Sequence, residues 1–196
     1  MVTVVPYDPD WAVRYEELRE EYTVALQAAG VSVRCIQHVG STAVSGQAAK
    51  PVIDIDIVVA SQDVAAASAV LEGLGFIALG ELGIPERWAF GQPKRLGETH
   101  TYVVVDGSLA LRNHLAVRDA LRADARLRDE YSAAKWAAAA TAANIDEYGS
   151  GKNATVQAIL HAAGISEADR DSIAAKQGAI VKTCGWVDLG NQLLTA

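Results

Sequence analysis

Two aspartates in the middle of an apolar segment constrain this chain more than any other feature of its sequence. The segment "KPVIDIDIVVA", residues 50–60, is rich in β-branched residues and is bounded by Pro51, which is typical of a strand. Because strand side chains alternate between faces, Asp54 and Asp56 share one face and the flanking isoleucines face a core. Two neighbouring carboxylates resist ionising together, so this face requires a cation, basic side chains or solvent.

A divalent cation is the first of these solutions. Carboxylate oxygens are typical ligands of Mg²⁺, so Asp54 and Asp56 are predicted to bind Mg²⁺ (or Mn²⁺) and to be catalytic. Gly40 and Ser41 precede Asp54 at the start of an expected helical turn, whose free backbone N–H groups suit a phosphate. A phosphate loop beside a metal site predicts phosphoryl or nucleotidyl transfer from ATP or another nucleoside triphosphate.

Basic side chains near this centre are candidates for contacts with the nucleotide. Lys50 precedes Pro51, where the chain is held extended. Arg87, with Lys94 and Arg95, lies in a Gly/Pro-rich stretch and is a candidate contact for a triphosphate or for an acidic substrate. Lys152 is expected to follow a Gly-Ser-Gly turn and to open a helix, which suits phosphate binding. For each of them, an ordinary solvated surface charge is the alternative.

Histidines supply the remaining candidates. His100 lies on an expected strand, where a neutral imidazole can ligate a metal or accept a proton, and it is predicted to be catalytic. His38 precedes the Gly-Ser turn and either makes a structural hydrogen bond or contacts a ligand. His114, Arg118 and Arg122 follow one another at intervals of four, so they form one stripe of a helix that faces either the site or solvent.

The remaining pattern predicts one domain with a C-terminal extension, in which Trp11, Tyr15, Trp88 and Trp136 are expected in the core. Gly, Pro and Asp residues punctuate the expected elements. Helices are expected at 11–29, 62–75, 109–143 with a break near 123–124, 152–163 and 166–184, and strands at 2–5, 31–39, 50–60, 76–79, 88–90 and 99–106.

Composition excludes some classes of protein. The net charge of −7 argues against a generic nucleic-acid coat, which needs a basic face. No run approaches the roughly 18 apolar residues that span a bilayer, and the first residues lack the pattern of a signal peptide. The two cysteines, Cys35 and Cys184, form no zinc motif. A cytoplasmic location with no membrane partner is therefore expected, and a homodimer is left open.

Several motifs together resemble the GrpB family (UPF0157), a branch of the nucleotidyltransferase superfamily related to DNA polymerase β. The resemblance runs from about residue 3 to residue 163 and rests on motifs in the following order: "VPYDPDW", "HVGSTAV.G..AKPVIDIDIVV", "HTYVVV", "HLAVRDALR", "EYSAAK" and "YGSGK". It implies an α/β (α+β) fold in which helices flank a small mixed sheet. It also implies phosphate binding by Gly40 and Ser41 and metal binding by Asp54 and Asp56.

The chain departs from the family pattern at three places. Ser45–Gly46 replaces a usual Pro-Gly, and His100-Thr101-Tyr102 replaces a usual His-x-His. The third carboxylate of polymerase-type relatives has no evident counterpart, and His100 is the predicted substitute.

Residues 1–163 are accordingly predicted to form a nucleotidyltransferase domain and residues 164–196 a helical extension packed on it. The predicted reaction moves a nucleotide from a nucleoside triphosphate to a small-molecule acceptor, forming an acyl-adenylate for ligation where the acceptor is a carboxylate. A non-catalytic nucleotide-binding or partner-binding module is the alternative. A further alternative is a ligand-free scaffold in which Lys50 or Arg87 neutralises the aspartates.

Overall fold

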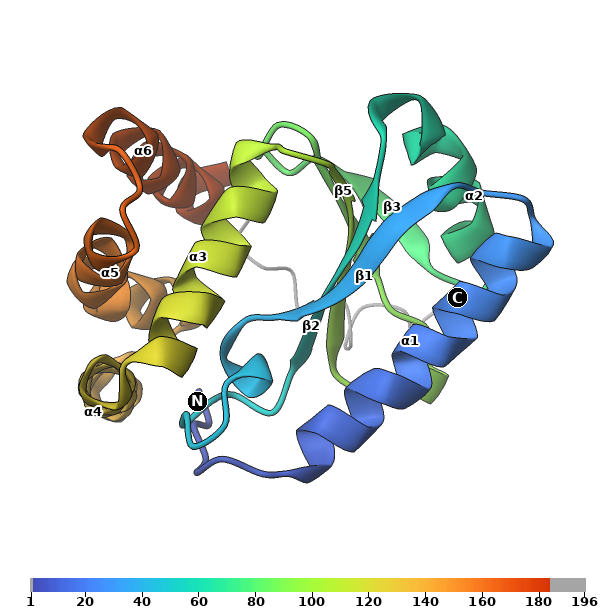
Figure 1. The fold of residues 1–196 in the computed structure, drawn as a ribbon. Helices are drawn as coiled ribbons and strands as arrows, with labels where there is room; N and C mark the ends of the chain where they lie inside the picture. The colour runs from blue at the N-terminus through green and yellow to red at the C-terminus, as the bar shows by residue number, and fades with distance from the viewer. Residues whose placement is uncertain (1, 184–196) are drawn as a thin grey trace.

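A mixed five-stranded sheet forms the centre of the molecule. The computed structural model describes residues 2–183, with side chains through residue 175. The strands are β1 (Val33–Val39), β2 (Ile53–Val59), β3 (Ile77–Gly80), β4 (Arg87–Gly91) and β5 (Thr99–Val105). They lie in the order β1-β2-β5-β4-β3, with β2 and β5 parallel and the other neighbours antiparallel. The predicted α/β class with a small mixed sheet is confirmed (Figure 1).

Helices cover the sheet in two groups. α1 (Asp10–Ala28) and α2 (Val64–Gly73) lie on one side, and α3 (Leu109–Ala123), α4 (Ala125–Thr141), α5 (Ile145–Ala162) and α6 (Glu167–Thr183) gather on the other (Figure 1). Short turns are η1 (Ser41–Ala43), η2 (Ser61–Asp63) and η3 (Lys94–Leu96). The break predicted near residues 123–124 is confirmed, because the Asp124 side chain caps α4 by accepting hydrogen bonds from the backbone N–H groups of Arg126 and Leu127.

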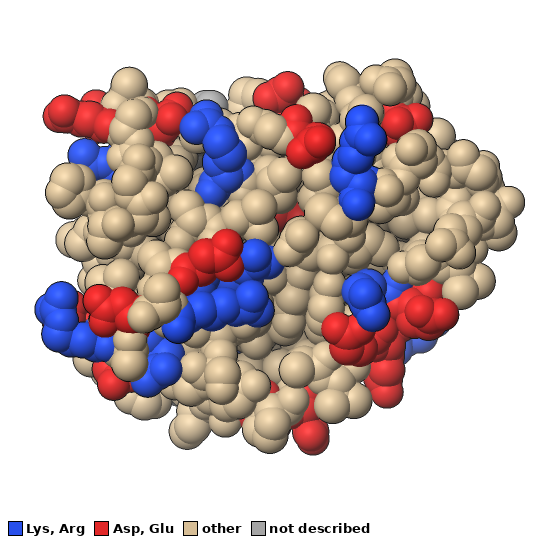
Figure 2. Space-filling view, in the orientation of Figure 1, with Lys and Arg blue, Asp and Glu red and all other residues tan. Residues whose placement is uncertain are grey.

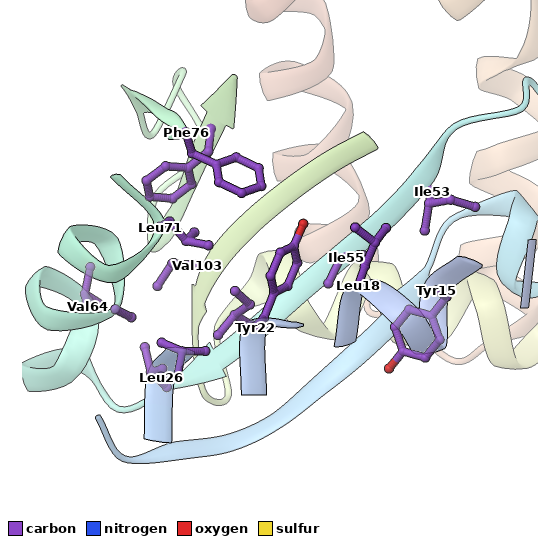
Figure 3. Packing of buried hydrophobic residues seen from close by; sticks show 14 of the residues in the cluster. Tyr15, Leu18, Tyr22, Leu26, Ile53, Ile55, Val64, Leu71, Phe76 and Val103 are labelled. Atoms are coloured by element: carbon purple, nitrogen blue, oxygen red, sulfur yellow. The ribbon is translucent and has the colours of Figure 1, made fainter. Parts of the chain in front are cut away.

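The isoleucines of β2 anchor the strand in the main core. Ile53, Ile55 and Ile57 are at most 1% exposed and pack with α1, α2 and β5. Figure 3 shows the α1 side chains beside Ile55. The Tyr22 hydroxyl lies 3.1 Å from Thr101 Oγ1, so this buried polar pair satisfies itself. The alternation of β2 therefore fixes its aspartates on the opposite face, as the sequence predicted.

A second core joins the helical group to the turn after β1. Val44, which follows η1, is fully buried among Leu121 of α3, Leu127 of α4 and Ile159 of α5. The segment between β1 and β2 is therefore held between the sheet and the helices.

Three local expectations are wrong. Residues 2–5 contribute only one bridge, between Val5 and Ala49, and no strand. Trp136 is 47% exposed, because it lies outside the buried stripe of α4. α5 begins at Ile145 rather than at residue 152, because Asn144 accepts hydrogen bonds from two backbone N–H groups of the first turn. Residues 149–151 are thus inside the helix.

The segment after residue 163 begins with α6, whose Ile173 packs in the second core. Residues 184–196, which include Cys184, lie outside the described residues, and the division at 163/164 stays a prediction. Over residues 2–183, every helix is too short or too polar to cross a membrane.

Replacing Ile55 by Ala should lower the free energy of unfolding by about 3–4 kcal/mol, because it leaves a cavity in a closed core. Val13→Ala on α1 is the control and should change it by less than about 0.5 kcal/mol, because Val13 is 58% exposed. Urea unfolding followed by circular dichroism measures both. Equal effects of the two substitutions would contradict this description of the core.

Candidate active site

Two aspartate–histidine pairs form the centre of the site. Asp54 Oδ1 lies 2.9 Å from His100 Nδ1, and Asp56 Oδ2 lies 2.8 Å from His114 Nδ1. His100 comes from β5, where it is the register partner of Asp54, and His114 comes from α3. Sequence analysis singled out three of these residues for the centre but left the facing of His114 open. In the structure, the side chain of His114 points toward the site.

The centre compensates its negative charge with hydrogen bonds. Burial alone would raise the pKa of Asp54, but the hydrogen bond and charge of His100, aided by His114 and Lys50, outweigh burial and lower it. The side chain of Asp56 is fully buried, and its Oδ1 has no hydrogen-bond partner within the described residues. The alternative in which Lys50 or Arg87 neutralises the aspartates through an ion pair is not found among the described residues, where the two histidines take that place.

The donor set fits a divalent cation that shares its ligands with a substrate. The unpaired Oδ1 of Asp56 supplies an anionic oxygen on the same face as Asp54. No group of three or more His, Cys, Asp or Glu side chains in the described part of the chain forms a protein-only metal cage. Mg²⁺ commonly takes one or two carboxylates and completes its shell with phosphate oxygens and water.

Gly40 brings the Gly40–Ser41 turn against this centre. Its φ is +69°, which favours glycine, and a Cβ built there would overlap the Asp54 carboxylate. Ser41 follows as the first residue of η1, as predicted. The turn therefore lies directly beside Asp54, where a metal and a phosphate could be held together.

A lysine cluster (Lys50, Lys135 and Lys152) lies behind this turn. Lys135 Nζ donates hydrogen bonds to Ser41 Oγ and to the Ala48 carbonyl, and it is 2% exposed. Burial lowers the pKa of Lys135 well below its ordinary value, with further lowering from Lys152 and Lys50 and an opposing effect of Asp54. Burial likewise lowers the pKa of Lys50, again opposed by Asp54. A bound anion would favour the charged forms of these three lysines, so the cluster suits an anionic ligand.

Sequence analysis missed Lys135, although a signal for it was present. The buried stripe of α4 contains Leu127, Tyr131, Lys135 and Ala138, so a lysine occupies a position where an apolar residue is expected. Lys152 is in the cluster, but not at a helix start as expected, because α5 begins earlier. Tyr131 raises the pKa of Lys152 above its ordinary value, although burial alone would lower it.

His38 is a structural residue in this arrangement. Thr42 Oγ1 donates to the Val52 carbonyl, so it accepts a hydrogen bond from His38 Nε2 at 3.1 Å. The ring also stacks on Tyr15 with its centroid 4.5 Å away. Burial lowers the pKa of His38 to about 4, despite the opposing charge of Asp54. The neutral ring of His38 therefore links β1 to the turn that contains Ser41 and Thr42.

The arginines of α3 hold the turn from the other side. Arg118 donates to Gln37 Oε1 and to the His38 carbonyl, and Arg122 donates twice to the Ala43 carbonyl. Arg118 also pairs with Asp119. Basic side chains gather over this part of α3 with acidic ones among them (Figure 2). The stripe thus faces the sheet and positions the turn.

Arg87 lies apart from the lysine cluster, on β4. Its guanidinium carbon lies 4.5 Å from the centroid of the Tyr102 ring, and the residue is 9% exposed. Lys94 and Arg95 are exposed, and Arg95 pairs with Glu21 of α1, so the structure does not bring these two to the centre. Glu98 is exposed and Asp106 pairs with Arg34, so neither supplies a third carboxylate here.

This fold and site define a class: a protein with a nucleotidyltransferase-like α/β fold in which an Asp-x-Asp strand lies beside a Gly-Ser turn. A chain in the structure of the GLD-2/RNP-8 complex has a similar fold, with a TM-score of 0.51 and 16% identity, covering 80% of this chain and 61% of that one. The structure of the conserved protein GrpB from Enterococcus faecalis is more similar, with a TM-score of 0.71 and 27% identity, covering 82% of this chain and 96% of that one.

The chain belongs to the GrpB family, because the family model described as GrpB protein matches residues 1–162. UPF0157 protein SCO7215 of Streptomyces coelicolor is 36% identical over 162 residues, which cover 81% of this chain and 82% of the relative. UPF0157 protein YqkA of Bacillus subtilis is 31% identical over 154 residues. That match covers 78% of this chain but only 44% of YqkA, so this chain spans less than half of that relative.

Replacing Gly40 by Ala should lower the free energy of unfolding by about 2–4 kcal/mol, because it combines an unfavourable φ with overlap on Asp54. Gly107→Ala is the matched control, since Gly107 has a φ of +76° and open space around its Cβ position. It should cost only about 1 kcal/mol. Thermal and urea unfolding of both variants measure the difference, and equal costs would show that the turn does not press on Asp54.

Acid should destabilise the protein through His38. Its pKa is about 4 when folded and near its ordinary 6.5 when unfolded, so only the unfolded chain takes up a proton between these values. Stability should therefore fall as the pH drops from 6.5 to 4, by about 3 kcal/mol from this residue. His38→Gln should remove that part of the slope, whereas the exposed His161→Gln should leave it. Urea titrations across this range test it, and an unchanged slope in His38→Gln would refute it.

Proposed function

We propose that this protein is a Mg²⁺-dependent nucleotidyltransferase that uses a nucleoside triphosphate, with ATP as the first candidate, to nucleotidylate a small-molecule acceptor. The observation that carries the proposal is the placement of opposite charges on the two sides of the Gly40–Ser41 turn. Asp54 and Asp56 lie on one side, and Lys135 lies on the other, bonded to Ser41. A metal-bound polyphosphate is the ligand that satisfies both sides at once.

The triphosphate is assigned to the turn and the lysine cluster. Backbone N–H groups and the Ser41 hydroxyl offer donors, and Lys50, Lys135 and Lys152 offer positive charge on the β1 side of the carboxylates. Charge-assisted hydrogen bonds of this kind are about twice as strong as neutral ones. Bound phosphate also supplies the anion that would make a charged Lys135 favourable in its buried position.

Asp54 and Asp56 would hold the metal, which when bound neutralises phosphate charge and orients the reacting groups. An oxygen of the acceptor forms a bond to the α-phosphorus, the bond from that phosphorus to the bridging oxygen breaks, and pyrophosphate leaves; a hydroxyl acceptor also gives up its proton to a base, whereas a carboxylate has none to lose. His100 keeps Asp54 in place through its 2.9 Å hydrogen bond, and His114 does the same for Asp56.

Pyrophosphate release with MgATP and a metabolite pool tests the catalytic proposal. The double substitution Asp54→Asn with Asp56→Asn should abolish it, because it removes both anionic metal ligands while keeping the side-chain shapes. Pyrophosphate release that survives in this variant refutes catalysis at the pair. Nucleotide binding by the wild type without turnover over a wide panel of acceptors would instead favour the non-catalytic module.

Lys135→Met should weaken MgATP binding by about 10- to 100-fold, the usual range for losing a charge-assisted contact. Lys94→Met is the matched control, because Lys94 is exposed on η3, and it should bind as the wild type does. Titration calorimetry measures binding, and thermal unfolding checks that each variant is folded. Equal affinities for the two variants would remove Lys135 from the nucleotide site.

A further inference from the structure

Among the side chains that the structure describes, Arg87 is a buried cation without an anionic partner. It is 9% exposed, its Nε has no hydrogen-bond partner, and none of the ion pairs of the described side chains includes it. On β4 it stands opposite Val104 of β5, among apolar neighbours that include Ala89. The face of Tyr102 offsets part of its charge, but a cation in such surroundings is costly without an anion.

Arg87 and the Gly40–Ser41 turn lie at different strands of the sheet. The turn follows β1, the carboxylates lie on β2, Tyr102 lies on β5 and Arg87 on β4, in that order across one face of the sheet. Asp56 and Tyr102 are direct register partners, and adjacent strands are about 4.8 Å apart. The Arg87 guanidinium, which lies over the Tyr102 ring, therefore stands beside the strand next to the two carboxylates, on their β4 side.

Within the described residues no third carboxylate lies beside Asp54 and Asp56, and this bears on the kind of acceptor that the site suits. On this face β5 presents His100 and Tyr102, and no third acidic side chain joins Asp54 and Asp56 within the described residues. A hydroxyl acceptor must lose a proton as it attacks, which calls for a base. A carboxylate acceptor is already ionised near neutral pH and needs none.

We infer that Arg87, stacked on Tyr102, binds a carboxylate of the acceptor, and that the acceptor is a small organic acid. This inference rests on the proposed function and names the substrate class of the same site. One carboxylate oxygen bonds to the α-phosphorus while the bond from that phosphorus to the bridging oxygen breaks. The products are a mixed acyl–nucleotide anhydride and pyrophosphate, and no proton is transferred. Arg87 suits this role because its planar guanidinium matches a carboxylate with two parallel hydrogen bonds.

Two measurements on the full chain test the inference. The first is binding of a panel of small aliphatic and aromatic carboxylic acids, their amides and phosphate monoesters, followed by saturation-transfer NMR without nucleotide. The second is acid-dependent exchange of pyrophosphate into ATP, with hydroxylamine added separately to trap the acyl product as a hydroxamate. The variants are Arg87→Gln and Arg87→Lys, and Arg34→Gln is the control because Arg34 is exposed. Thermal unfolding confirms that each variant is folded.

The wild type should bind carboxylates in preference to amides and phosphate monoesters and should form hydroxamate. Arg87→Gln should raise the Kd or KM for the acid by about 10- to 100-fold, and Arg87→Lys should recover only part of the loss. MgATP affinity of Arg87→Gln should stay within about twofold of the wild type. Arg34→Gln should match the wild type throughout.

Other outcomes separate the two proposals. A loss of MgATP binding in Arg87→Gln would place Arg87 on the triphosphate and overturn the inference, while the proposed function would stand. A preference for phosphate monoesters, or no carboxylate binding by the wild type, would also overturn it. Absence of MgATP binding in the wild type would refute the proposed function, and the NMR arm would still decide whether Arg87 binds acids.

Discussion

The hydrogen bonds from His100 and His114 to the aspartates of β2 are the contacts around which the rest of the site is arranged. Two carboxylates on one strand face repel each other, and burial adds to the cost. The histidines reduce that cost from β5 and α3, so the sheet and the helical group must keep one relative position. Within the described residues Oδ1 of Asp56 has no hydrogen-bond partner, and it is the oxygen proposed to bind the cation.

The same packing that fixes the carboxylates also fixes the turn beside them. Val44 is buried between three helices, Arg118 binds the His38 carbonyl before η1, and Arg122 binds the carbonyl of Ala43, the last residue of η1. His38 of β1 bonds to Thr42 of the turn, and Thr42 in turn bonds to the Val52 carbonyl just before β2. These contacts are made by a neutral imidazole ring, an apolar side chain and arginines that bind carbonyl oxygens. They therefore do not use the backbone N–H groups of the turn or the lysine cluster.

Several motifs that the chain shares with the GrpB family lie on one side of the proposed site. The motif with the Gly-Ser turn and the two aspartates builds the side proposed for the nucleotide, and the later "EYSAAK" and "YGSGK" motifs contribute Lys135 and Lys152 to it. The side proposed for the acceptor is built from β4 and β5, where Arg87 meets Tyr102. On one face of the sheet, the proposed site of the nucleotide is thus separate from the proposed site of the acceptor.

Local sequence determined the elements and the facing of the central strand. The period of two in β2 placed Asp54 and Asp56 together, and Asp124 marked the break between α3 and α4, because these signals depend on neighbours in the chain. Tertiary structure alone decided that Lys135 reaches Ser41 across 94 positions of sequence and that His114 reaches Asp56 across 58. It also left Trp136 in solvent. Such outcomes depend on how helices dock on the sheet, which a local pattern does not encode.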